Sequence, residues 1–190
     1  GFKYTDQGLL KQEVVQPDDA LQLTTNYSYD AFGNGKTTTV SGAGLTGRTS
    51  TTVYDANGKF PKTVTNALGH AETRTYNAQF GVLKTLIGPN KLATHWDYDS
   101  FGRKQQERRA DGSKTQWLRA VASDCKAAHP AAVWCLIERK YDTNNANPQE
   151  SSSQFDKFGR TVRSVGTGFD GRPVLIDKTY DHLGREKSLS

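Results

Sequence analysis

The sequence predicts an all-β chain built of consecutive antiparallel hairpins. An aromatic residue followed by Asp or Asn, and shortly afterwards by Gly, recurs along the chain. Further turn signals fall between these copies, and the segments that separate the turns are rich in Thr, Val and aromatic residues. Turns at intervals of about 8–12 residues, separated by such segments, indicate short strands that follow one another directly.

The turn motif has six copies, and in several of them a basic residue follows the Gly. Its residues are Tyr29, Asp30 and Gly33; Tyr54, Asp55 and Gly58; Tyr76 and Asn77; Tyr98, Asp99, Gly102 and Arg103; Phe155, Asp156, Gly159 and Arg160; Tyr180, Asp181, Gly184 and Arg185. The aromatic positions step by 25, 22 and 22 residues and, after an interruption, by 25. Self-similarity at such a period is typical of a repeat architecture.

Each residue type in the motif has a structural role. Asp or Asn at the first position of a type I turn accepts hydrogen bonds from the backbone two residues on, and Gly supplies the left-handed conformation that the fourth position needs. The aromatic residue ends a strand, and stacked aromatics contribute about 0.5–1.5 kcal/mol per pair beyond burial. The basic residue covers an aromatic face with its stem while its charged end stays in water.

The strands are expected between these turns and a second set of turns near the middle of each unit. The second set comprises residues 66–69, 88–90, 111–112 and 170–171, and the clearest strand segments are residues 36–40, 49–54, 62–65, 72–76 and 93–98. In the last segment Thr94, Trp96 and Tyr98 alternate with the other three residues, which is the period of two that a strand shows.

The basic stretch at residues 98–112 fits the same scheme. Residues 98–103 form one turn, Asp111 and Gly112 belong to the next, and residues 104–110 are the strand between them. Its Arg and Lys residues are therefore interpreted as one solvated face of a sheet.

Residues 117–150 interrupt the repeat and are expected to form strand, loop and strand. Cys125, His129 and Cys135 lie there, but three groups at this spacing match none of the common zinc patterns, which use four ligands. The two cysteines form a loop-closing disulfide if the protein is exported, and otherwise remain free thiols. Residues 144–153 are polar and are expected to form a surface excursion.

The motif resembles a known family pattern. Tyr98-Asp-Ser-Phe-Gly-Arg103 and Tyr180-Asp-His-Leu-Gly-Arg185 are similar to the YD repeat, also called the Rhs repeat, of bacterial Rhs-type and insecticidal Tc-type toxins. The resemblance implies a curved, spiralling β-sheet strip that forms part of a hollow shell. It implies a single array over residues 1–190, with repeats at about 25–116 and 141–190 and an insertion at about 117–140. The family's self-cleaving region contains an Asp-Pro dipeptide, which is absent here, so self-cleavage is not carried over.

The function that the resemblance implies is structural. We expect a segment of the wall that encapsulates a toxin polypeptide in a secreted or cell-surface bacterial protein. The partners are then the flanking repeats of the same protein, the enclosed polypeptide, and copies of the chain that pair through open strand edges. The alternative is a recognition or adhesion module for a glycan or a cell-surface receptor.

Several other classes of function lack support in the sequence. There is no Gly-x-Ser-x-Gly and no His-Glu-x-x-His motif, so no enzymatic activity, catalytic residue, cofactor or metal is expected. Residues 42–47 contain a Gly-x-Gly-x-x-Gly pattern but lack the strand-helix context of a dinucleotide site, and we interpret them as a flexible loop. The net charge is +5 with both signs interspersed, which does not favour nucleic acid as a partner. No apolar run reaches the about 20 residues that a membrane span needs.

Overall fold

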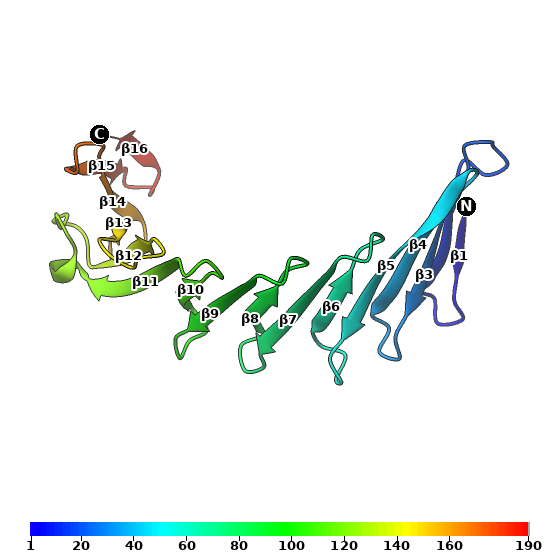
Figure 1. The fold of residues 1–190 in the computed structure, drawn as a ribbon. Helices are drawn as coiled ribbons and strands as arrows, with labels where there is room; N and C mark the ends of the chain where they lie inside the picture. Colours follow the sequence, from blue (N-terminus) through cyan, green and yellow to red (C-terminus); the bar gives the residue numbers. More distant parts are fainter. Residues whose placement is uncertain (190) are drawn as a thin grey trace. The chain divides into compact units, whose positions relative to one another are not determined.

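A computed structural model describes residues 1–189 and confirms the all-β prediction (Figure 1). In this part of the chain the elements are short strands and one turn of 3₁₀ helix. They are β1 (Phe2–Tyr4), β2 (Leu10–Val15), β3 (Leu23–Tyr29), β4 (Gly35–Gly42), β5 (Leu45–Tyr54), β6 (Pro61–Thr65), β7 (Ala71–Asn77), β8 (Val82–Ile87), β9 (Ala93–Tyr98), β10 (Lys104–Arg108), β11 (Lys114–Val121), η1 (Ala122–Asp124), β12 (Trp134–Tyr141), β13 (Gln149–Phe155), β14 (Thr161–Thr167), β15 (Pro173–Tyr180) and β16 (Glu186–Leu189).

The chain divides into two compact units, which we call unit 1 (Gly1–Ala93) and unit 2 (from Thr94 onward). In unit 1 the strands β1 to β8 lie side by side in chain order, each antiparallel to the next. In unit 2 the strands β9 to β16 follow the same rule. The predicted succession of antiparallel hairpins is confirmed within each unit.

Unit 1 is a sheet without a buried core. None of its described residues is buried, because within this unit the strands form a single layer. Threonine-rich strands suit such a sheet, since threonine carries a β-branched body and a hydroxyl that can bond across strands. The hydroxyls of Thr39 and Thr49 lie 2.8 Å apart, and those of Ser28 and Thr37 also bond across the β3–β4 pair.

Unit 2 has a small core around the insertion. The strands β11 and β12 pair over their full lengths, and the loop between them folds back so that Cys125, Cys135 and Ile137 are buried together. Gln154 on the neighbouring strand β13 is fully buried as well. The insertion therefore supplies the covering layer that unit 1 lacks.

Two expectations about loops are wrong. Residues 149–153 are not a surface excursion: they belong to strand β13, where Ser152 is buried, because the insertion loop covers that face of the sheet. Residues 42–47 are not a flexible loop. Gly42 ends β4 and pairs with Leu45 at the start of β5, so this stretch forms a tight hairpin.

No helix in the described part of the chain is long and apolar enough to cross a membrane.

Candidate functional site

The repeated turn is built around the side-chain oxygen of its first residue. Oδ1 of Asp99 accepts hydrogen bonds from the backbone N–H groups of Phe101 and Arg103, both at 2.9 Å. The backbone closes the same turn, because Asp99 N–H donates to the Arg103 carbonyl and Gly102 N–H donates to the Asp99 carbonyl. One carboxylate oxygen thus satisfies two amides that the turn would otherwise leave unpaired.

The same arrangement recurs at the other predicted turns. Asp30, Asp156 and Asp181 each accept from the residues two and four positions on. The turns at Asp55 and Asn77 are each one residue longer, yet their side-chain oxygens still accept backbone N–H groups. An amide oxygen is sufficient, since Asn66 forms an equivalent turn with Leu68 and His70.

The glycine of the motif adopts a conformation that other residues avoid. Gly102 has φ +76°, in the left-handed region, and Gly33, Gly58, Gly159 and Gly184 behave alike. At Gly58 the space is also restricted, because an added Cβ would lie 2.3 Å from the ring of Phe32 in the preceding turn. Successive turns of unit 1 are therefore in contact, and Asn34 reinforces this contact by donating to the Gly58 carbonyl at 2.8 Å.

The basic residue of the motif is bound by the aspartate of its own turn. Arg103, Arg160 and Arg185 form ion pairs with Asp99, Asp156 and Asp181 at 2.6–2.7 Å. The Arg160 guanidinium also lies over two rings, 5.1 Å from the centre of Phe158 in its own turn and 4.6 Å from that of Tyr180 in the next repeat. This cation–π contact joins consecutive repeats of unit 2.

Two motif tyrosines bridge strands that splay apart. The hydroxyl of Tyr29 donates to the Leu10 carbonyl, and that of Tyr180 donates to the Thr161 carbonyl, both at 2.7 Å. Each acceptor lies 19 residues earlier, on the preceding strand, beyond the point where the ladder between the two strands ends. Sequence reasoning assigned these aromatics to stacking and missed the hydroxyl bond. Stacking does occur elsewhere, between Phe60 and Tyr76 and between Trp134 and Phe155.

A further copy of the turn lies near the start of the chain. Thr5 replaces the aspartate, and its hydroxyl oxygen accepts the backbone N–H of Leu9 at 3.1 Å. Gly8 has φ +79° and donates to the Thr5 carbonyl. Tyr4 precedes this turn by one residue and lies 25 residues before Tyr29, which is the signal that identifies it.

The insertion loop is fastened to the sheet at several points. Cys125 and Cys135 are joined by a disulfide bond. The buried Gln154 side chain accepts the backbone N–H of His129 at 2.7 Å and donates to the carbonyl of Lys126 at 2.8 Å. His129 is therefore placed by its backbone amide, and its Nδ1 accepts the backbone N–H of Ala131 at 3.1 Å.

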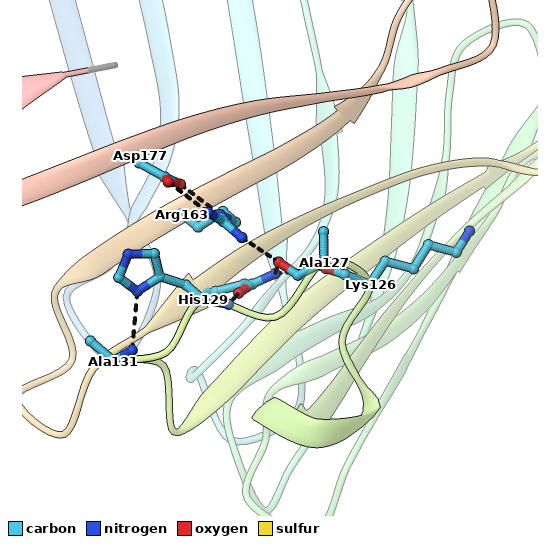
Figure 2. Close-up of polar contacts among 7 residues, drawn as sticks. Lys126, Ala127, His129, Ala131, Arg163 and Asp177 are labelled. Carbon is cyan, nitrogen blue, oxygen red and sulfur yellow. Dashed lines mark hydrogen bonds and ion pairs between the residues drawn. The ribbon is translucent and has the colours of Figure 1, made fainter.

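Figure 2 shows the neighbouring attachment, where Arg163 on β14 reaches both the loop and β15. Its guanidinium donates to the Ala127 carbonyl at 2.7 Å and forms two 2.6 Å bonds with the Asp177 carboxylate. These charge-assisted bonds hold the pKa of Asp177 below its ordinary value, and burial opposes them. The attachment is structural, because each polar group in it already has a partner.

Two of the turn carboxylates, Asp99 and Asp181, have a pKa below the ordinary value of the group. At Asp181 the backbone N–H of Arg185, followed by its side chain, lowers the pKa, and these bonds outweigh the effect of burial. At Asp99 burial raises the pKa, but the hydrogen bonds from Arg103 and Phe101 outweigh it, so the pKa is again below its usual range. The folded turn therefore favours the charged carboxylate.

Among the described residues, no group of three or more His, Cys, Asp or Glu side chains is placed to hold a metal ion. The motif residues lie at separate turns, and within a unit neighbouring copies are joined by the contacts of Phe32, Asn34 and Arg160.

Comparison with solved structures finds similar folds at low identity. The crystal structure of TcdB2-TccC3-Cdc42 aligns at 12% identity and a TM-score of 0.49 over 100% of this chain and 12% of that chain. That of TcdB2-TccC3 without its hypervariable C-terminal region aligns at 13% and 0.47, over 99% of this chain and 12% of the other. The structure of the Photorhabdus luminescens Tc holotoxin pore with the TccC3-D651A mutation aligns at 11% and 0.47, over 100% and 12%.

The chain thus spans about an eighth of the length of these structures. No protein-family model and no curated protein matches it. The architecture of this chain is established by the strands and turns described above.

Replacing the turn glycine tests the requirement for positive φ. Gly102→Ala is expected to destabilise unit 2 by about 1–3 kcal/mol, because a Cβ is strained in the left-handed region. Ser100→Ala in the same turn is the matched control, since Ser100 has no positive φ. Urea unfolding of both variants measures the difference, and equal midpoints would contradict the assignment.

The lowered carboxyl pKa values predict an acid-sensitive fold. A group whose folded pKa is depressed stabilises the fold above its unfolded pKa, and this stability is lost as the pH falls below about 4. Asp99→Asn with Asp181→Asn keeps an oxygen for the backbone N–H groups but removes the titration, so the fall in melting temperature between about pH 5 and pH 3 is expected to flatten.

Asp6→Asn with Asp18→Asn is the control for this pH experiment, because neither carboxylate accepts a hydrogen bond in the structure. An equal flattening in the control would show that the turn carboxylates are not the acid-sensitive groups.

The hydroxyl bridge of Tyr180 is tested by Tyr180→Phe. The ring and its contact with Arg160 remain, while the Thr161 carbonyl loses its donor, so a loss of about 1 kcal/mol in the free energy of unfolding is expected. Tyr54→Phe is the control, since no hydrogen bond from the Tyr54 hydroxyl is present. A loss of the same size in both variants would remove the bridge as the cause.

Proposed function

We propose that this chain is a structural segment of a shell wall that encloses a toxin polypeptide in a secreted or cell-surface bacterial protein. The proposal includes no catalytic step. One observation carries it: most of the side chains that define the repeats are engaged in holding their own turn or joining it to the next. At Asp156, for example, the carboxylate accepts the backbone N–H groups of Phe158 and Arg160 and forms an ion pair with the Arg160 guanidinium.

A sheet of this kind suits a wall. Each strand is held by its sequence neighbours, so the sheet can be lengthened by adding repeats without a new core. Within the described residues, β1 and β16 each pair with one strand only, so each has an unpaired edge. We propose that flanking repeats, or other copies of the chain, pair with these edges. The resemblance of the turns to the YD repeat supports the enclosing role.

The enclosure is tested by protease protection in a protein that contains this chain together with the proposed flanking repeats and the enclosed polypeptide. Gly102→Val with Gly159→Val is expected to break two wall turns and to expose the enclosed polypeptide to protease, whereas the unmodified protein protects it. Ser100→Val with Lys157→Val adds the same side chains to the same turns at positions without positive φ, and is expected to retain protection.

Two outcomes would contradict the proposal. One is an unmodified protein whose polypeptide is cleaved as fast as in the glycine variants. The other is salt-resistant binding of a defined sugar in the hollow of about 570 Å³ between Phe101 and Trp117, which would favour the recognition role instead.

A further inference from the structure

The return strand of each repeat carries a β-bulge at one fixed place, and lysine occupies it in most copies. The register slips by one residue immediately after the residue that pairs with the motif aromatic, so one residue of the return strand has no partner. These extra residues are Lys11, Lys36, Lys62, Lys84, Gln105, Val162 and Lys187. A bulge re-aims the side chain it carries, so a recurring residue type at this place is a recurring feature of the surface.

The four bulge lysines of unit 1, Lys11, Lys36, Lys62 and Lys84, are free to bind an external anion. All four are exposed, and none takes part in an ion pair or a hydrogen bond. Among the described residues of unit 1 the one ion pair joins Arg74 to Glu72. In unit 2, by contrast, most acidic side chains already hold a basic partner, as Glu150 holds both Arg139 and Lys126.

The strand register fixes how these lysines are spaced. Thr37, the residue after Lys36, pairs with Thr51 on β5, and Thr51 in turn pairs with Thr65 on β6. In the next repeat the residue after the bulge lysine is Thr63. It lies two residues from Thr65, so each repeat is offset from the previous one by two residues along the strands. Two strand spacings make about 10 Å across the sheet and the offset makes about 7 Å along it, which separates successive lysines by about 12 Å.

A hollow lies at Lys62, the third of the four bulge lysines of unit 1. It measures about 400 Å³, and Lys59, Lys62 and Arg74 line it with the rings of Phe60 and Tyr76, which are stacked 4.8 Å apart. Asp55 also borders the hollow, but its carboxylate is engaged by the backbone N–H groups of Lys59 and Phe60. Two unpaired ammonium groups beside an aromatic surface favour a carboxylate on a partly apolar segment.

We propose that this row, Lys11, Lys36, Lys62 and Lys84, binds an extended acidic polypeptide segment, with the hollow at Lys62 as its central contact. In an extended chain, residues four apart lie on the same face and about 13 Å apart, which matches the spacing of the lysines. A segment with Glu or Asp at every fourth position reaches all four. The proposal goes beyond the wall role, since binding by the chain alone does not require enclosure.

The charge density of the row favours polypeptide over nucleic acid. A nucleic-acid strand carries one phosphate per about 3.4 Å of duplex axis, several times denser than one lysine per about 12 Å. The row would leave most phosphates unneutralised, whereas it neutralises every carboxylate of a segment that is acidic at every fourth position.

The test is a fluorescence-anisotropy titration of the whole chain with a labelled peptide of about thirteen residues that has Glu at every fourth position and Thr or Ser between. Lys36→Gln, Lys62→Gln and Lys84→Gln together are expected to weaken binding about tenfold. The control triple variant, Lys3→Gln, Arg48→Gln and Lys91→Gln, removes the same charge from exposed positions of unit 1 outside the bulges, and is expected to change binding about twofold or less. Melting curves establish that both variants are folded.

A second peptide of the same composition, with its Glu residues adjacent, is expected to bind more weakly than the spaced one. The proposal is overturned if the two triple variants lose equal affinity, because net charge alone would then explain binding. It is also overturned if the two peptides bind equally, or if single-stranded DNA of similar length binds more tightly than the spaced peptide at about 150 mM salt.

Discussion

The side-chain oxygen at the first position of each motif turn is the interaction on which the sheet depends. In unit 1 no described residue is buried, so hydrophobic packing of a core does not hold the strands in register. In the motif hairpins, as at Asp30, the register is set at the turn by one oxygen that accepts two backbone amides and by a glycine with positive φ. Asp, Asn and, at Thr5, a hydroxyl fill this position, because the geometry requires an acceptor and not a charge.

Contacts between repeats provide the second level of order. They differ in chemistry from one place to the next. The Asn34 amide donates to the Gly58 carbonyl, and the Tyr29 hydroxyl donates to the Leu10 carbonyl of the preceding strand. The Arg160 guanidinium lies over the ring of Tyr180. Each is worth little alone, in the range of about 0.5–2 kcal/mol. Because they recur along the sheet, their sum gives neighbouring hairpins a fixed relation within a unit.

The features that the sequence predicted are those that close over a few residues. Asp99, Gly102 and Arg103 lie within one turn, so residue type and spacing were sufficient to identify it. The Tyr180 hydroxyl bond spans 19 residues and depends on where two strands splay, which no local pattern encodes. Gln154 follows three serines and resembles a surface residue, and only the insertion loop folding over it makes it buried. The turn at Thr5 was missed because the pattern required Asp or Asn.

Strand order that repeats chain order has a consequence for how this molecule folds. Each hairpin closes over a short stretch of chain, so the entropy lost on closure is small, and contact order stays low for a sheet of this size. A strand that emerges during synthesis finds its partner already in place, and the next turn forms from residues that arrive immediately afterwards. Folding can therefore keep pace with the delivery of the chain, with one growing edge exposed at any moment.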